Sequence, residues 1–144
     1  MFIEQILKDK GRDVATVTSS SVVREALGTL REHGIGALIV CDDGTTIAGI
    51  LSERDIVRAL ADRGADVLTE AVAVLMSTEV VTATESVTIE QLMAMMTDRR
   101  IRHVPIVDEQ GLRGIVSIGD VVKSRLRELE TERGQLVEYI SRGG

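Results

Sequence analysis

The hydrophobic and polar positions of this chain form a pattern that occurs twice. In each copy a short apolar stretch, residues 14–18 or 80–84, is followed by apolar residues at spacings 0, 3, 4 and 7. That spacing puts the apolar side chains on one face of a helix, so it predicts an amphipathic helix in each copy. The positions are Val23, Ala26, Leu27 and Leu30 in the first copy, and Ile89, Leu92, Met93 and Met96 in the second.

Two further apolar segments in each copy predict an antiparallel hairpin, because a turn of two to five polar or Gly-containing residues joins them. A second helix follows each hairpin, starting near Arg54 and near Gly119. The predicted unit is therefore β-α-β-β-α. Its hairpin strands are expected over residues 37–41 and 47–51, and over residues 104–107 and 112–116.

The two copies also share a polar frame, Gly-x-x-Ser-x-x-Asp, at residues 49–55 and 114–120. Stacked repeats need recurring apolar positions, but they have no comparable need for a recurring Ser-x-x-Asp. Asp55 and Asp120 could instead be helix-start residues, since a carboxylate in the first turn stabilises a helix by about 0.3–1 kcal/mol. Two occurrences, each with a serine three residues earlier, favour two related ligand sites.

Side-chain oxygens near the start of the first helix in each copy are candidate N-caps. They are Ser20 or Ser21 in the first copy and Ser86 or Thr88 in the second, where Thr88 and Gln91 can form a capping box.

Short apolar helices are predicted before each unit, around Leu7 and around Leu75, and residues 62–66 are expected to form the loop between the halves. Cys41 lies in an apolar run and is expected to be inert core. Pro105, which has no N–H to donate, is expected at a strand edge or beside a ligand.

After the second unit the last helix is expected to continue with an apolar seam. The seam residues are Val122, Leu126, Leu129, Leu136 and Ile140. Arg133 interrupts it, and Gly134 predicts a kink because glycine costs a helix up to ~1 kcal/mol relative to alanine. Two interpretations are open: the seam lies on its own domain, or it packs on a partner chain.

Composition narrows the classes of function. The chain has 144 residues, a net charge of −6 and only two aromatic residues, Phe2 and Tyr139, so stacking on single-stranded nucleic acid is disfavoured. No apolar run approaches the ~20 residues of a membrane span, and residues 1–12 lack a signal-peptide core. The single cysteine fits a reducing compartment, so a cytoplasmic location is expected.

One more segment carries a family resemblance. The second copy contains Arg102-His103-Val104-Pro105-Ile106-Val107-Asp108. With the duplicated Gly-x-x-Ser-x-x-Asp, this run resembles the cystathionine β-synthase (CBS) repeat, and the tandem pair resembles a Bateman module.

The resemblance implies an α/β (α+β) fold of two CBS repeats packed as a pseudo-twofold pair, with a C-terminal helical extension. It divides the chain into residues 1–66, 67–128 and 129–144. It also implies a homodimer in which four repeats form a flat disc.

CBS pairs often bind adenosine-containing ligands such as AMP, ADP, ATP, NAD(H) or S-adenosylmethionine in clefts between the repeats. By the resemblance, the aspartates accept hydrogen bonds from ribose hydroxyls, the serines contact ribose or phosphate, and basic side chains contact phosphate. The backbone of residues 14–16 and 80–82 would frame the adenine. The implied nucleotide-binding residues are Val14, Thr16, Ala37, Ser52, Arg54, Asp55, Val80, Thr82, Arg102, His103, Pro105, Ser117 and Asp120.

The basic residues are expected to make the two sites unequal. Arg102 and His103 put positive charge near the second motif, whereas their counterparts in the first copy are Gly36 and Ala37. Arg54 partly compensates there. Arg99 and Arg100 are interpreted as a solvated helix end. Either the sites differ in affinity, or one ligand draws phosphate contacts from both halves.

The function expected from these features is a regulatory module that senses an adenine nucleotide, most readily AMP, as an energy or metabolite signal. The module needs no obligatory cofactor or metal, and its C-terminal helix could contact a downstream protein. The alternatives are an interaction scaffold with empty clefts and weak nucleic-acid binding through residues 99–103. An enzyme is disfavoured because two histidines and one cysteine leave few nucleophile–base pairs.

Overall fold

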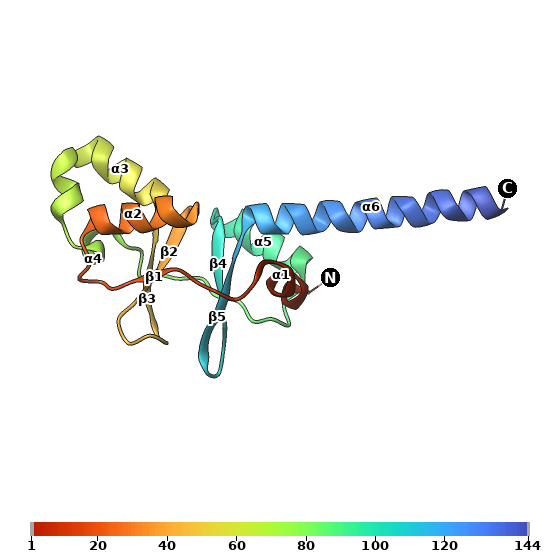
Figure 1. The fold of residues 1–144 in the computed structure, drawn as a ribbon, viewed down its shortest axis with the longest axis horizontal. Coiled ribbons are helices and arrows are strands. Elements are labelled where there is room, and N and C mark those ends of the chain that lie inside the picture. The colour runs from red at the N-terminus through yellow and green to blue at the C-terminus, as the bar shows by residue number, and fades with distance from the viewer. Residues whose placement is uncertain (1, 144) are drawn as a thin grey trace.

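The chain folds into two lobes, and one long helix projects from the second lobe (Figure 1). The computed structural model describes residues 2–143. The first lobe contains β1 (Thr16–Val17), α2 (Val23–His33), β2 (Ala37–Cys41), β3 (Ile47–Ser52), α3 (Glu53–Arg63), a 3-10 helix η1 (Ala65–Thr69) and α4 (Val72–Leu75). The second lobe contains α1 (Ile3–Lys10), α5 (Ile89–Arg99), β4 (His103–Asp108), β5 (Gly111–Ser117) and the first turns of α6 (Ile118–Gly143).

The sheets confirm the predicted hairpins. Strand β2 is antiparallel to β3 and β4 is antiparallel to β5, while β1 runs parallel to β2. The strand predicted over residues 80–84 was wrong in extent, because only Ala83 forms a bridge, to Ile106.

Pro105 explains the missing strand. In the first lobe the Ile39 amide donates to the Ala15 carbonyl, over 3.4 Å. The repeat places Pro105 at the position of Ile39, and proline has no amide proton to donate. Pro105 is buried and lies on the edge of β4, where its carbonyl accepts from the Ala83 amide at 3.1 Å. The edge position predicted for Pro105 is therefore confirmed.

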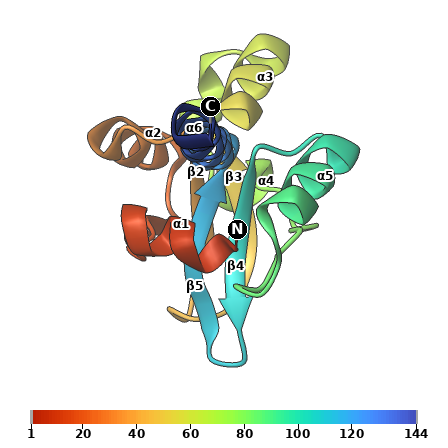
Figure 2. The ribbon, with the colours of Figure 1, turned by 90° about the vertical axis from the view of Figure 1, so that its right-hand side faces the viewer.

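Each lobe has its own apolar core, and the short leading helices are exchanged between the cores. Ile3, Ile6 and Leu7 of α1 are buried with residues of α5, β4 and β5 in the second lobe. Val67 of η1 and Val72 of α4 are buried in the first lobe. Figure 2 shows α1 and α5 on either side of the β4–β5 hairpin.

Two motif glycines allow these exchanged helices to approach. A Cβ atom added at Gly49 would lie 2.7 Å from the Ser77 carbonyl oxygen, and one added at Gly114 would lie 2.7 Å from Leu7 Cδ2. Glycine is thus required for packing at position 49, where the neighbour is backbone, whereas a side chain at position 114 would have to move the buried Leu7 side chain.

Helix starts differ from expectation in the first lobe. Thr88 and Gln91 form the predicted capping box, with hydrogen bonds of 3.1 and 3.0 Å. Neither Ser20 nor Ser21 caps α2, whose N-cap is Val22. The carbonyl of Glu70 accepts from the Val23 amide at 2.9 Å, so a tertiary contact replaces the expected side-chain cap.

The connection between lobes is also more ordered than expected. Residues 62–66 were expected to be a loop, but α3 continues to Arg63 and η1 begins at Ala65. The core contact of Val67 gives this segment a reason to form a helical turn. Cys41 is buried, as expected for a core residue.

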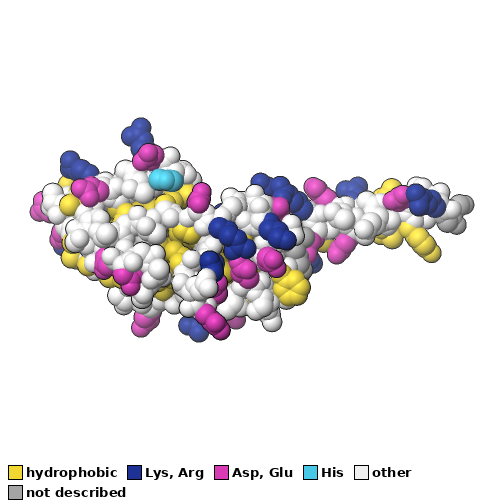
Figure 3. Space-filling model, turned by 60° about the horizontal axis from the view of Figure 1, so that its bottom comes forward, with side chains coloured by type: hydrophobic (Ala, Val, Ile, Leu, Met, Phe, Trp, Pro, Cys, Tyr) yellow, Lys and Arg dark blue, Asp and Glu magenta, His cyan; other side chains and the backbone are white. Residues whose placement is uncertain are grey.

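Helix α6 is continuous through Gly134, so the predicted kink is wrong. Glycine keeps its backbone N–H and C=O, and nothing within 4 Å of a Cβ at this position would bend the helix. The distal half of α6 does not lie on its own domain but extends beyond it, with hydrophobic side chains exposed near its end (Figure 3). Among residues 2–143 there is no helix long and apolar enough to cross a membrane.

Candidate functional site

Two clefts lie at the junction of the lobes, and each combines the polar motif of one copy with residues of the other. The first cleft, of about 300 Å³, brings Ser52 and Asp55 together with Val80 and residues 100–103. The second cleft, of about 390 Å³, brings Ser117 and Asp120 together with Val14, Ala15 and residues 33–37.

Both motifs form the same local structure at a strand-to-helix junction. Ser52 Oγ accepts from the Asp55 amide at 3.1 Å, and Asp55 Oδ2 accepts from the Ser52 amide at 2.9 Å. Ser117 and Asp120 repeat both bonds with the same lengths. Each Ser-x-x-Asp is therefore a reciprocal capping box, which gives the motif a structural role in addition to any contact with a ligand.

The two aspartates differ in their remaining contacts. Asp55 has no ion-pair partner among the residues described. Asp120 Oδ2 receives Lys10 Nζ at 2.6 Å, and Lys10 also donates to the Ile115 carbonyl at 2.9 Å. Lys10 therefore neutralises the carboxylate of the second cleft only.

The Lys10 contact also sets the protonation of Asp120. Partial burial alone would raise the pKa of Asp120, but the hydrogen bonds from Lys10 and Ser117 outweigh it and lower the pKa from its ordinary value. The second cleft thus holds an ionised carboxylate that is already paired.

Positive charge gathers in the first cleft. Its walls include four arginines that form no ion pair within residues 2–143: Arg54, Arg58, Arg100 and Arg102. Three carboxylates, from Glu53, Asp55 and Glu79, line the same cleft. Arginines thus outnumber carboxylates in this cleft, whereas carboxylates outnumber basic residues in the whole chain, which has a net charge of −6.

This arrangement corrects the expected pairing of Arg102 with the second motif. Arg102 lines the cleft of the first motif, beside Arg54, and His103 lines both clefts. Each cleft is assembled across the repeats, so the positive charge of the second copy faces Ser52 and Asp55.

Arg100 was interpreted as part of a solvated helix end, yet its backbone conformation is unusual. It adopts a left-handed conformation at the C-cap of α5, with φ 54°, and is the only non-glycine residue with positive φ among those described. Gly34 occupies the corresponding C-cap of α2, with φ 61°. A side chain at such a position is strained, which favours a role for the Arg100 guanidinium in the first cleft.

Gly36 and His103 form the wall between the clefts. Both residues line both cavities, and a Cβ at Gly36 would lie 3.4 Å from His103 Nε2. Burial lowers the pKa of His103, and the charges of Lys10 and Arg102 lower it further, against the opposing effects of Asp120 and Glu53. The imidazole is therefore neutral at pH 7.

The remaining implied residues divide into two groups. Val14, Ala37, Ser117 and Asp120 line the second cleft, and Ser52, Arg54, Asp55 and Val80 line the first. Thr16, Thr82 and Pro105 line neither cleft. Lys10 and Arg58 were missed in the sequence. Arg58 lies one helical turn after Arg54, which is the signal that could have identified it, whereas Lys10 lies before the segments whose sequences match between the two copies and gives no signal.

Within the part of the chain that is described, no cluster of His, Cys, Asp and Glu side chains could hold a metal ion.

Comparison with known proteins identifies the family. The CBS domain matches residues 6–62 and 70–127. The mitochondrial CBS domain-containing protein CBSX3 of Arabidopsis thaliana is 34% identical over 98% of this chain and 72% of its own length. A crystal structure of a CBS-domain protein from Agrobacterium tumefaciens is 46% identical, with a TM-score of 0.84 over 87% of this chain and 99% of that one.

A third relative was crystallised with ligands. The CBS-domain pair of protein MJ0100, in complex with 5′-methylthioadenosine and S-adenosyl-L-methionine, is 28% identical, with a TM-score of 0.76 over 88% of this chain and 98% of that one. These matches cover both lobes and both clefts. The chain belongs to the CBS-domain family and carries two CBS domains in tandem.

Proposed function

We propose that this protein is a regulatory module that binds a phosphorylated adenosine ligand in its first cleft. The observation that carries the proposal is the meeting of the Asp55 carboxylate with Arg54, Arg58, Arg100 and Arg102 in one cavity. Arginine holds phosphate through bidentate hydrogen bonds, and a carboxylate accepts from neighbouring hydroxyl groups. The adenosine ligands of the MJ0100 domain pair support the nucleoside part of the assignment.

The cleft suggests how each part of such a ligand would be held. Asp55 uses Oδ2 in the capping box, and its Oδ1 accepts no hydrogen bond from the described residues, so Oδ1 is available to ribose hydroxyls. The walls contributed by Ile50, Ile101 and Val80 offer an aliphatic environment for adenine. The arginines would hold one or more phosphates at the open side. AMP is the simplest ligand that uses all three elements.

The second cleft would bind such a ligand more weakly. The charge of Asp120 is already neutralised by Lys10, which makes its carboxylate a weaker acceptor for ribose hydroxyls, and no arginine of the described chain lines this cleft to hold a phosphate. One ligand per chain follows from this difference.

The structure offers a route from the first cleft to α6. The Arg102 carbonyl accepts from the Ile118 amide at 2.8 Å, which joins the cleft to the first residue of the helix. A ligand that binds one arrangement of this junction more tightly than another would shift the population of the two. The module would then act as a metabolite or energy sensor without catalysing a reaction.

The proposal includes a homodimer, because apolar side chains on α3 and α6 are exposed, among them Val57 and Val122. A downstream protein would bind the dimer through α6. The proposed location is the cytoplasm, as the single, buried cysteine suggests.

A thermal melt tests the proposal. The melting temperature would be followed with an external dye, because the chain has no tryptophan, against AMP, ADP, ATP, NAD⁺, NADH, S-adenosylmethionine and 5′-methylthioadenosine. A ligand at 100 times its dissociation constant stabilises the folded state by about 2.7 kcal/mol. At this chain length that corresponds to a rise of roughly 5–10 °C.

The expected result is a rise with phosphorylated ligands that exceeds the rise with 5′-methylthioadenosine, and that is reduced in Asp55→Asn but not in Asp120→Asn. Asparagine keeps an acceptor for the capping box, so the variants isolate the charge. If none of the ligands raised the melting temperature, the result would favour an interaction scaffold.

A further inference from the structure

We infer that α6 is the docking surface for the α6 helix of a second copy of this chain, running in the opposite direction. The inference gives the proposed homodimer one specific contact. It does not depend on ligand binding, because none of the α6 residues that form the surface lines the first cleft.

The surface is an apolar seam along one side of α6. Its residues fall at heptad positions a and d: Gly119, Val122, Leu126, Leu129, Arg133, Leu136 and Ile140. The seam is open to solvent, since the side chains of Leu126 and Leu136 are 56% and 58% exposed. Tyr139, beside its distal end, is 74% exposed. Apolar a and d positions over about three heptads are the pattern of a helix that packs on another helix.

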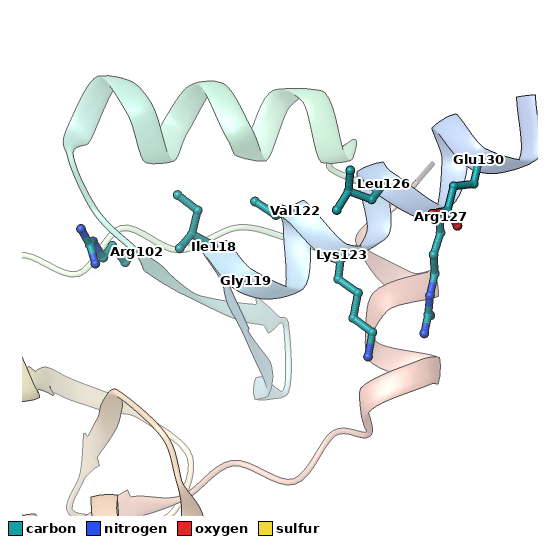
Figure 4. Close-up of a pocket in the computed structure, with 8 residues that line it drawn as sticks. All are labelled: Arg102, Ile118, Gly119, Val122, Lys123, Leu126, Arg127 and Glu130. Atoms are coloured by element: carbon teal, nitrogen blue, oxygen red, sulfur yellow. The ribbon is translucent and has the colours of Figure 1, made fainter. Parts of the chain in front are cut away.

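The proximal part of the seam is a shallow groove. Figure 4 shows Ile118, Val122 and Leu126 leaving the same side of α6, with Lys123 and Arg127 on another side. The groove has a volume of about 680 Å³ and extends from Arg102 to Glu130. Gly119 contributes no side chain to it, which leaves room for a large residue from outside.

Charge selects the direction of the second helix. In a parallel pair, Arg133 would face Arg133 of the second copy inside the seam, and the like charges would repel. In an antiparallel pair, position a faces position d of the other helix, so Arg133 faces an apolar residue. The flanking positions then pair with one another across the seam, e with e and g with g.

Charge also selects the register. When Leu126 lies opposite Leu129 of the second copy, Lys123 faces Glu130 and Arg125 faces Glu132, and symmetry doubles both pairs. In the same register, Ile118 faces Tyr139 and Gly119 faces Leu136. A shift of one heptad in either direction replaces these pairs with Glu–Glu or with Lys–Lys and Arg–Arg contacts. One antiparallel register is therefore complementary in both charge and shape.

The residues that form these pairs are available. Lys123, Glu130 and Glu132 form no ion pair within the described chain. Arg125 contacts Glu128 at 2.8 Å in a part-buried pair and Glu90 at 3.6 Å in a more exposed one, and we expect it to exchange the Glu90 contact for Glu132 of the second copy. Arg133 at one a position would then fix the register, as isolated polar residues do in coiled coils.

Cysteine cross-linking of the full-length chain tests the direction and register. Leu126→Cys and Leu129→Cys would be prepared separately and then mixed in a thiol–disulfide buffer. The inference predicts disulfide-linked dimers in the mixture and few in either variant alone, because position 126 of one chain would face position 129 of the other. Thr131→Cys, on the far side of the helix, is the matched control, and the unmodified chain controls for the buried Cys41.

Sedimentation velocity with charge variants supplies a second test. Arg125→Glu should weaken the dimer several-fold, and adding Glu132→Arg in the same chain should restore it, because the pair is re-formed with reversed charge. A parallel pair would not be rescued in this way, since residue 125 would then face Glu130.

Three results would overturn the inference. They are cross-linking of Leu126→Cys alone at the level of the mixture, no cross-linking above the Thr131→Cys control, and a monomeric unmodified chain. If cross-linking did not exceed the Thr131→Cys control but the unmodified chain still dimerised, the proposed homodimer would stand and its interface would lie elsewhere. None of the three affects the ligand proposal, which the melting experiment tests separately.

Discussion

At the scale of single residues, the two motif aspartates show how duplicated sites diverge without changing their local fold. Asp55 and Asp120 keep the same capping geometry, with bonds of 2.9 and 3.1 Å to their serines. The difference comes from residues outside the motif: Lys10 pairs with Asp120, whereas arginines surround Asp55. The two clefts are therefore distinguished by the neighbours of the Ser-x-x-Asp motifs and not by the motifs themselves.

Arg100 is expected to lower the stability of the fold and to strengthen ligand binding. In the left-handed region an L-residue costs about 1–2 kcal/mol, and the extra flexibility of unfolded glycine costs about 0.5–1 kcal/mol. Arg100→Gly is therefore expected to stabilise the fold by about 0.5 kcal/mol while weakening AMP binding roughly tenfold, the loss of one charge-assisted contact. Urea unfolding and isothermal titration measure the two effects. Arg99→Ala, outside both clefts, should leave binding unchanged, and a weaker fold in Arg100→Gly would contradict the account.

Lys10→Met should remove the ion pair that Asp120 forms with Lys10. Losing the partly exposed ion pair and the bond to Ile115 is expected to cost about 1 kcal/mol at pH 7. The lowered pKa of Asp120 contributes stability above the unfolded value near 3.9, and this contribution disappears as the pH falls through the folded pKa. The difference in unfolding free energy between the unmodified chain and Lys10→Met should therefore be smaller at pH 3 than at pH 7. Lys8→Met, which breaks an exposed pair with Glu4, is the control, and a pH-independent difference would refute the role given to Lys10.

At the scale of elements, the sequence predicted most of the fold because periodic apolar positions and turn residues are local signals. The hairpins, the capping box of Thr88 and the long last helix all follow from such signals. The failures involve long-range contacts. The Glu70 carbonyl, rather than a serine, caps α2, and the position of Pro105 against residues 81–83 shortens a strand. Spacing alone cannot show which distant backbone group will be near.

The motif glycines belong to the same class of tertiary constraint. Gly49→Ala would put a Cβ 2.7 Å from the Ser77 carbonyl oxygen, so the backbone must shift, at an expected cost of about 1–3 kcal/mol. Gly28 lies on the exposed face of α2, with nothing within 4 Å of an added Cβ, so Gly28→Ala should stabilise the fold by about 0.5–1 kcal/mol. Urea denaturation of both variants measures the sign of the change in unfolding free energy. No change in Gly49→Ala would mean that the segment after α4 does not pack as closely as described.

At the scale of the whole molecule, the site arises from the exchange of partners between repeats. Most of the residues predicted from the sequence line one of the clefts, including Asp55, Arg102 and His103. Arg102 was paired with the wrong motif, because adjacency along the chain suggested a site within one copy. Assembly across the lobes means that a ligand in either cleft contacts both repeats. Such a ligand can report on their relative arrangement.

The distal part of α6 should be separable from the ligand site. Both cores and both clefts lie within residues 2–127, and Val121 is the α6 residue of the apolar cores. Removal of residues 131–144 is therefore expected to leave the AMP dissociation constant within about twofold, or ~0.4 kcal/mol. The same truncation should weaken self-association. Isothermal titration and sedimentation velocity check the two outcomes, and a lost ligand site would contradict the separation.

Calorimetric titration of the chain with AMP tests whether the first cleft is the ligand site. We expect tight binding of one AMP per chain, retained in Asp120→Asn and weakened at least tenfold in Asp55→Asn, a loss of about 1.4 kcal/mol. The opposite dependence, with binding lost in Asp120→Asn and kept in Asp55→Asn, would contradict the assignment of the ligand to the first cleft.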